Sequence, residues 1–177
     1  MVKLNALFKL SPAIAIKYFK SKNNKLSWDW YELWQSAHRK SFTVAKAMLG
    51  RYCLSGNLTV CTDEIYNTIK QSIEFYEHIK PIIKKGTTTV IDTKQMTSFL
   101  APKGTTHLIR ESLDGSEKVV YAYAIDAPLA SLEIEVGDYI LKNSYNAPAD
   151  LKVAGGKVYL TAGDCAMWGT VLHFVKK

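Results

Sequence analysis

Three side chains that can move protons or stabilise charge, His107, Arg110 and Glu111, lie within one short stretch of the chain. The surrounding residues 105–111 predict a β-strand. Because side chains alternate along a strand, His107 and Glu111 would share one face and Arg110 would point the other way. A histidine and a glutamate on one face could act as acid and base in RNA cleavage, with a nearby cation stabilising the charged phosphorane. The alternative is that these residues lie on the solvated face of a half-exposed sheet.

Other signs of chemistry are sparse. His173, on the last predicted strand, is a second histidine that the same reaction could use, although the sequence does not place it near the first. No nucleophile elbow, zinc-binding helix motif, phosphate-binding loop or calcium loop occurs. Cys53, Cys61 and Cys165 lack the spacing of a zinc site, so the sequence predicts neither a metal nor a cofactor. It favours a protein that is not an enzyme, and a small ribonuclease-like domain if it is one.

One polar aromatic segment could bind a ligand. Tyr139, Asn143, Ser144, Tyr145 and Asn146 follow a Gly-Asp turn, and aromatic rings can stack on a nucleic-acid base. The tendency of asparagine to occupy turns explains the same residues equally well.

The elements that must position these side chains are helices first and strands afterwards. Helices are predicted over residues 12–19, 29–48 and 62–80, the last ended by Pro81. Strands are predicted over residues 87–91, 105–111, 118–125, 132–136, 139–142, 157–161 and 170–175. Asp114-Gly115 is a strong hairpin signal, and Tyr121 and Tyr123 alternate with Ala122 and Ala124. We therefore expect an α+β fold with N-terminal helices followed by a compact antiparallel sheet or small barrel.

The net charge of +7 belongs to the N-terminal part of the chain. Residues 1–50 hold nine Lys or Arg and two Asp or Glu, whereas residues 51–177 hold fourteen of each. A turn-rich stretch follows Gly50. We therefore predict two parts: a basic, tryptophan-rich helical arm over residues 1–50 and an α+β domain over residues 58–177. Such an arm suits an acidic partner, nucleic acid included, although a solvated lysine-rich face would look the same.

Three of the four tryptophans lie in this arm, at positions 28, 30 and 34. Trp30 and Trp34 are four residues apart and would share one helix face. Tryptophan is a frequent anchor at protein interfaces, so this face could dock on a partner protein. The tryptophans could equally fasten the helices onto the β domain. The residues we expect to contact a partner are Trp28, Trp30, Trp34, His38, Arg39, Lys40 and Lys46.

Residues 8–48 resemble the N-terminus of Mu F-like phage minor head proteins. The resemblance rests on Ser11-Pro12-Ala13-Ile14-Ala15-Ile16-Lys17-Tyr18-Phe19, on Trp28-Asp29-Trp30, and on Trp34-Gln35-Ser36-Ala37-His38 with the following Phe42-Thr43-Val44-Ala45-Lys46. It implies a virion or head-morphogenesis protein that associates with the portal and the capsid interior. After Met48 the sequence departs from the larger domain of that family.

The resemblance leaves two functions open. In the first, a phage-derived minor head protein docks through its basic arm on a portal or capsid protein. In the second, a Mu F-like leader precedes an effector or toxin domain, either RNase-like or ADP-ribosyltransferase-like. No window approaches the roughly 18 apolar residues that a membrane span needs, and no signal peptide is evident. We therefore expect the protein in the virion or in the cytoplasm of a bacterial host, with no membrane partner.

Overall fold

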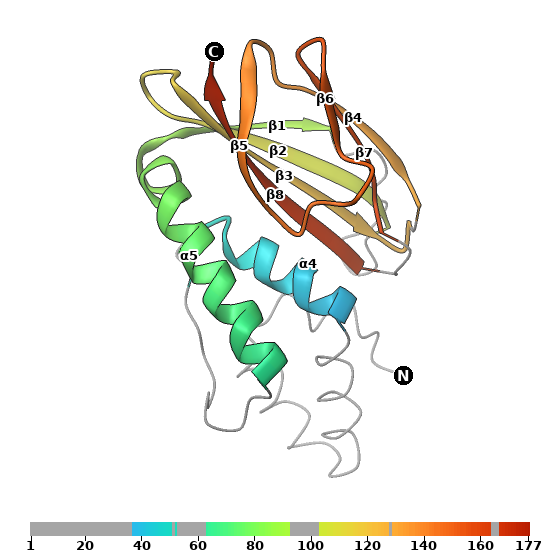
Figure 1. Ribbon diagram of the computed structural model, residues 1–177. Coiled ribbons are helices and arrows are strands. Elements are labelled where there is room, and N and C mark those ends of the chain that lie inside the picture. Colours follow the sequence, from blue (N-terminus) through green and yellow to red (C-terminus); the bar gives the residue numbers. More distant parts are fainter. Residues whose placement is uncertain (1–36, 51, 53–62, 93–102, 128, 164–166) are drawn as a thin grey trace, which may run out of the picture.

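The protein folds into three layers: helices, a five-stranded sheet and a three-stranded sheet (Figure 1). The computed structural model describes residues 37–50, 52, 63–92, 103–127, 129–163 and 167–177. The helices are α4 (Ala37–Ala47) and α5 (Asp63–Lys85). The strands are β1 (Thr87–Asp92), β2 (Gly104–Glu111), β3 (Glu117–Ile125), β4 (Ser131–Glu135), β5 (Tyr139–Tyr145), β6 (Lys152–Ala154), β7 (Lys157–Thr161) and β8 (Met167–Lys176). The predicted α+β class is confirmed.

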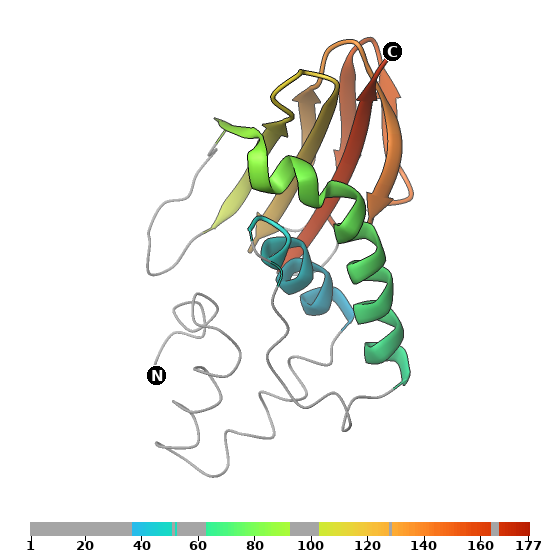
Figure 2. The same cartoon turned by 90° about the vertical axis from the view of Figure 1, so that its left-hand side faces the viewer.

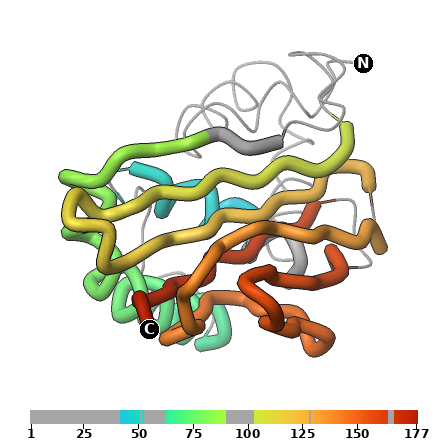
Figure 3. Tube along the Cα trace, turned by 90° about the horizontal axis from the view of Figure 1, so that it is seen from above, coloured from blue at the N-terminus to red at the C-terminus, as the bar shows by residue number. Residues whose placement is uncertain are grey.

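The large sheet has the order β1-β2-β3-β8-β5, and every neighbouring pair is antiparallel. Viewed from above in Figure 3, its strands lie side by side over the helices. The small sheet has the order β4-β7-β6 and is also antiparallel. The predicted sheet is therefore two sheets that face each other.

β3 is buried on both faces because it lies in the middle layer. Tyr121 and Tyr123 face α4 and α5, whereas Ala122 and Ala124 belong to the cluster between the two sheets. The predicted alternation of tyrosine and alanine is confirmed. Small alanines on one face and large rings on the other let the sheet pack closely against the second sheet while filling the space beneath the helices.

α5 begins with Asp63 and Glu64 in its first turn, where the helix dipole favours anions. Its buried stripe runs from Ile65 to Ile83 at helical spacing. The prediction that Pro81 helps to end this helix is wrong, because Pro81 lies inside α5. Burial of Ile82 and Ile83 against the sheet stabilises one further turn, and this outweighs the hydrogen bond that proline cannot make.

The hairpin between β2 and β3 forms at the predicted Asp-Gly pair. Asp114 Oδ1 accepts hydrogen bonds from Ser112 Oγ at 2.6 Å, from Ser116 Oγ at 2.7 Å and from Ser116 N at 3.1 Å. The Ser112 bond, followed by those from Ser116, lowers the pKa of Asp114 to about 2. Gly115 has φ 66°, a left-handed conformation that glycine adopts without strain.

Candidate functional site

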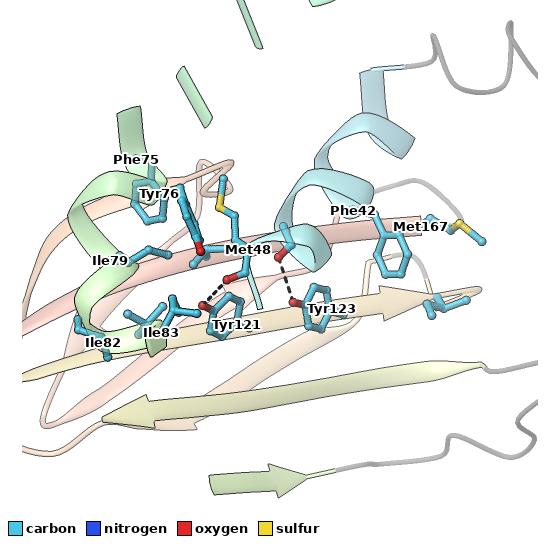
Figure 4. Packing of buried hydrophobic residues seen from close by; sticks show 14 residues of the cluster. Phe42, Met48, Phe75, Tyr76, Ile79, Ile82, Ile83, Tyr121, Tyr123 and Met167 are labelled. Atoms are coloured by element: carbon cyan, nitrogen blue, oxygen red, sulfur yellow. Dashed lines mark hydrogen bonds between the residues drawn. The ribbon is translucent and has the colours of Figure 1, made fainter. Parts of the chain in front are cut away.

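The C-terminal end of residues 8–48, which resemble Mu F-like proteins, is built into the protein core. Phe42, Ala45 and Met48 are buried in the cluster between the helices and the five-stranded sheet. Figure 2 shows α4 beside the strands of this sheet, and Figure 4 shows Phe42 and Met48 within the cluster. Tyr121 Oη donates to the Met48 carbonyl at 3.0 Å, and Tyr123 Oη donates to the Ala45 carbonyl at 3.3 Å. These two bonds satisfy carbonyls at the end of α4, where no further helical turn supplies a donor. α4 is therefore held on the sheet by packing and by hydrogen bonds.

Burial of Tyr121 and Tyr123 raises the pKa of both phenols. Both therefore stay protonated at physiological pH and keep their role as donors to α4. Phe42 adds an edge-on contact to the Tyr123 ring, with centroids 5.8 Å apart.

α4 comes close to β8 at Gly169. A Cβ atom at this position would lie 3.0 Å from Tyr123 Cδ1 and 3.2 Å from both Ala45 Cβ and Phe42 Cα. We expect Gly169→Val to lower the free energy of unfolding by about 1–3 kcal/mol, because α4 must move away from the sheet. Gly169→Ala should cost less, since one methyl group needs a smaller shift. Denaturant unfolding measures the loss. Hydrogen exchange should locate it in α4, and loss of protection confined to another element would contradict this explanation.

The residues predicted to contact a partner are only partly described. Trp28, Trp30 and Trp34 lie outside the described residues. His38, Arg39 and Lys40 lie in α4, and Lys46 is exposed near its end with Nζ 6.0 Å from the Phe42 ring centroid. Their role in docking stays a prediction.

The three candidate catalytic residues are not gathered at one point. His107 and Glu111 lie on the same side of β2 as Ile109, which belongs to the cluster between the sheets. Arg110 faces α5 instead: its Nε donates to the Ile82 carbonyl at 3.0 Å and its Nη1 to Thr88 Oγ1 at 2.8 Å. The predicted division between the two faces therefore holds.

His107 is 6% exposed, and four residues of strand separate its Cα from that of Glu111 by roughly 13 Å. The Glu111 carboxylate instead accepts from Tyr139 Oη at 3.2 Å and lies 3.5 Å from Lys118 Nζ. These contacts fasten β2 to β3 and β5. The catalytic assignment stays a prediction, and no contact described here brings its three members together.

His173 lies on the helix-facing side of β8, opposite to the side of His107 on β2. It shares this side with Val171, whereas Leu172 belongs to the cluster between the sheets. Its side chain is 1% exposed, and Nε2 lies 2.6 Å from Glu117 Oε2. Burial lowers the pKa of the His173 imidazole, although the bond to Glu117 opposes this effect. The neutral ring therefore donates from Nε2, and Nδ1 has no hydrogen-bond partner among the described residues.

This burial predicts a loss of stability on acidification. The unfolded chain takes up a proton on His173 near pH 6.5, whereas the folded protein does so only at lower pH. The free energy of unfolding should therefore fall as the pH drops below about 6.5 and level off below the folded pKa. Chemical denaturation at a series of pH values measures it.

The His173→Gln variant should lack that fall in stability. His78→Gln, which removes an exposed histidine of α5, should retain most of it, because the charge of His78 is the smallest of the causes that act on the His173 pKa. If wild type and His173→Gln lose stability in parallel, the imidazole is not the source.

A groove of about 520 Å³ lies between α5 and the end of β5. The wall from β5 and the turn after it is the polar segment noted in the sequence: Asn143, Ser144, Tyr145 and Asn146. The wall from α5 consists of Glu64, Thr68, Gln71, Glu74, Phe75 and His78. Tyr139, which the sequence grouped with these residues, lies elsewhere: its hydroxyl donates to Glu111 and to the Gly115 carbonyl.

The groove is polar and carries two carboxylates with one histidine. The Tyr145 ring packs at a centroid distance of 6.2 Å from the buried Phe75 ring, with an angle of 45° between the two ring planes. Burial raises the pKa of Tyr145, which keeps its hydroxyl neutral. The binding of a nucleic-acid base by this segment stays a prediction. Among the described residues, no group of three or more His, Cys, Asp or Glu could hold a metal ion, and neither helix is long and apolar enough to cross a membrane.

Comparison with known structures shows a shared fold. The chain matches two crystal structures of a variant GH36 α-galactosidase, AgaA, from Geobacillus stearothermophilus, in complexes with 1-deoxygalactonojirimycin and with raffinose. Each match has a TM-score of 0.58 and 19% sequence identity, and covers 76% of this chain and 19% of the enzyme. At this identity the likeness concerns the fold alone.

Comparison with known sequences shows similarity to a phage protein. No protein-family model matches the chain. The chain is 32% identical over 80 residues to the putative capsid assembly protein F of Escherichia phage Mu. The match covers 44% of this chain and 17% of the phage protein, so the chain spans less than a fifth of that relative. The similarity supports a Mu F-like relationship at the level of the family.

Proposed function

We propose that this chain is a phage- or prophage-derived, head-associated protein whose basic N-terminal segment docks on a portal or capsid protein. The observation that carries the proposal is the 32% identity over 80 residues to a capsid assembly protein. The concentration of positive charge in residues 1–50 supports it, because a basic segment attracts an acidic partner surface.

The packing of α4 gives this segment a rigid base. Phe42, Ala45 and Met48 fix the end of the Mu F-like segment on the five-stranded sheet. A segment held at its base loses less conformational entropy on docking than a free tail does. The β domain then acts as the body that carries the docking segment.

Replacing Trp30 and Trp34 by alanine in the full chain tests this proposal. If these rings anchor the interface, affinity for the portal or capsid protein from the same genome should fall by at least about 30-fold, the effect expected from a tryptophan hot spot. Binding is measured by surface plasmon resonance with the purified proteins. Tyr159→Ala is the matched control, because it removes a 38%-exposed aromatic ring from β7 in the three-stranded sheet.

Thermal unfolding of the same variants separates docking from folding. A loss of binding with an unchanged melting temperature supports docking. A loss that comes with a lowered melting temperature means that the tryptophans belong to the protein's own core, and this contradicts the proposal. Binding to DNA that weakens steeply with salt, with no affinity for head proteins, would favour a nucleic-acid-binding arm instead.

A further inference from the structure

β5 carries an asparagine whose side chain lies against the backbone nitrogen that can attack it. The Ser144 amide donates to Asn143 Oδ1 at 2.8 Å. The carboxamide carbon Cγ lies one C=O bond beyond that oxygen, which places it roughly 3.1–3.6 Å from Ser144 N at the usual hydrogen-bond angles. Reacting atoms in a near-attack arrangement are about 3–3.5 Å apart. Asn143 is also exposed, so water reaches its side chain.

The backbone of β5 is irregular at this position. The pairing of β5 with β8 shifts register between Leu141 and Asn143, so an irregularity interrupts the ladder directly before Asn143. β5 is also the last strand of the five-stranded sheet, and one side of its backbone is not paired within that sheet. Position 143 is therefore held less firmly than a residue in a regular central strand, and the small rotation that closes a ring on Cγ meets less resistance.

We propose that Asn143 is a site of spontaneous deamidation, with Ser144 N as the nucleophile. Hydroxide takes the proton from Ser144 N, and this nitrogen forms a bond to Asn143 Cγ. The Cγ–Nδ2 bond then breaks with its electron pair on Nδ2, which takes a proton from water and leaves as ammonia. Water opens the resulting five-membered imide at either carbonyl and gives aspartate or isoaspartate. No atom is oxidised or reduced. The inference goes beyond the proposed docking function and does not depend on it.

The same ring closure is opposed at Asp114-Gly115, the pair that local chemistry alone would favour. Glycine has no side chain to hinder attack by its nitrogen. In the structure, however, Gly115 N donates to the Ser112 carbonyl at 3.0 Å, and Asp114 Oδ1 accepts from the Ser112 and Ser116 hydroxyls. The Ser112 bond, followed by those from Ser116, lowers the pKa of Asp114 to about 2. Its carboxyl group therefore stays ionised, and a carboxylate is a poor electrophile. The fold reverses the order of reactivity of the two pairs.

Asn146 provides a comparison close to Asn143. Its Nδ2 donates to the Gly169 carbonyl at 2.8 Å, so the nitrogen that would leave as ammonia is held on β8. We therefore expect Asn146 to react more slowly than Asn143.

The reaction would alter β5 and the groove that it lines. Either product places a carboxylate at position 143, on the groove wall opposite α5. Isoaspartate also adds one main-chain carbon to β5 opposite His173, the residue that Asn143 pairs with. Hydrogen exchange in residues 143–145 should therefore be faster in the isoaspartate form than in the unreacted protein.

Peptide mapping of the full chain tests the inference. Folded protein and guanidinium-unfolded protein are incubated at the same mildly alkaline pH, and mass spectrometry follows the conversion of amide to acid at positions 143 and 146. Asn143 should convert about 10-fold faster in the folded protein, because the reacting atoms are already held close together. Asp114, whose isomerisation is followed by chromatographic retention, should react more slowly when folded. Conversion of Asn143 that is equal or slower in the folded protein would overturn the inference.

Substitutions then assign the nucleophile. Ser144→Val should slow the conversion of Asn143 several-fold, because a branched side chain hinders attack by the nitrogen of its own residue. Asn67→Gln, which changes an exposed asparagine of α5, should leave the rate at position 143 unchanged. Circular dichroism checks that both variants are folded before the incubation. Conversion of Asn143 as fast in Ser144→Val as in the wild type would overturn the inference.

Discussion

Replacing Met48 by alanine should lower the free energy of unfolding by about 3 kcal/mol, the typical loss for a large side chain truncated in a core. Met48 is 0% exposed and packs in the cluster between the helices and the five-stranded sheet. Its backbone carbonyl remains available to Tyr121 in the variant, so the loss measures side-chain packing. Guanidinium unfolding of the full chain gives the value.

Lys46→Ala is the control for Met48→Ala. Lys46 is exposed, and its Nζ lies 6.0 Å from the Phe42 ring centroid, a contact worth about 0.5–1 kcal/mol at such sites. The alanine variant at position 46 should therefore lose about 1 kcal/mol or less. Similar losses at positions 46 and 48 would contradict the burial of Met48 in the core.

Gly86→Ala should destabilise the protein by about 2–4 kcal/mol, in the range of overpacked core sites. A Cβ atom at Gly86 would lie 2.4 Å from the Glu111 carbonyl oxygen and 2.6 Å from the Ile82 carbonyl oxygen. Both obstacles are backbone atoms, so α5 or β2 must shift to make room. The Gly86 amide also donates to the Ile82 carbonyl at 2.7 Å, and this bond ends α5 directly before β1.

Gly50→Ala is the matched control for Gly86→Ala. A Cβ atom at Gly50 would meet nothing within 4 Å among the described residues. This alanine should leave stability unchanged or raise it by up to about 1 kcal/mol, because it restricts the unfolded chain. The two variants are compared by their denaturant midpoints. Equal midpoints would show that the junction between α5 and β1 tolerates a side chain.

Local patterns in the sequence predicted much of this fold. The order of helices and strands, the Asp114-Gly115 hairpin and the alternation of Tyr121 with Ala122 all follow from short-range periodicity and turn chemistry. β6 was missed because it has only three residues and ends at the Gly155-Gly156 turn, too short to show an alternating pattern.

Contacts between distant segments could not be predicted in this way. Alternation shows which residues of β3 share a face, but not that α4 covers one face and the small sheet the other. The pairing of β2 with β3 and of β3 with β8 places His107 and His173 on opposite faces of the five-stranded sheet. The order of these strands in the sheet is set by packing, which the local sequence does not show. The sequence marked Asn143 to Asn146 as polar, yet the groove also needs α5, whose residues lie more than sixty positions earlier.

Docking on a head protein is tested most directly by photo-crosslinking from the tryptophan-bearing segment. Trp30 is replaced in the full chain by a photoreactive phenylalanine derivative, and the protein is irradiated with portal and capsid proteins from the same genome. We expect mass spectrometry to identify crosslinks from position 30 to one of these head proteins. Crosslinks confined to the chain itself would contradict the proposed docking role.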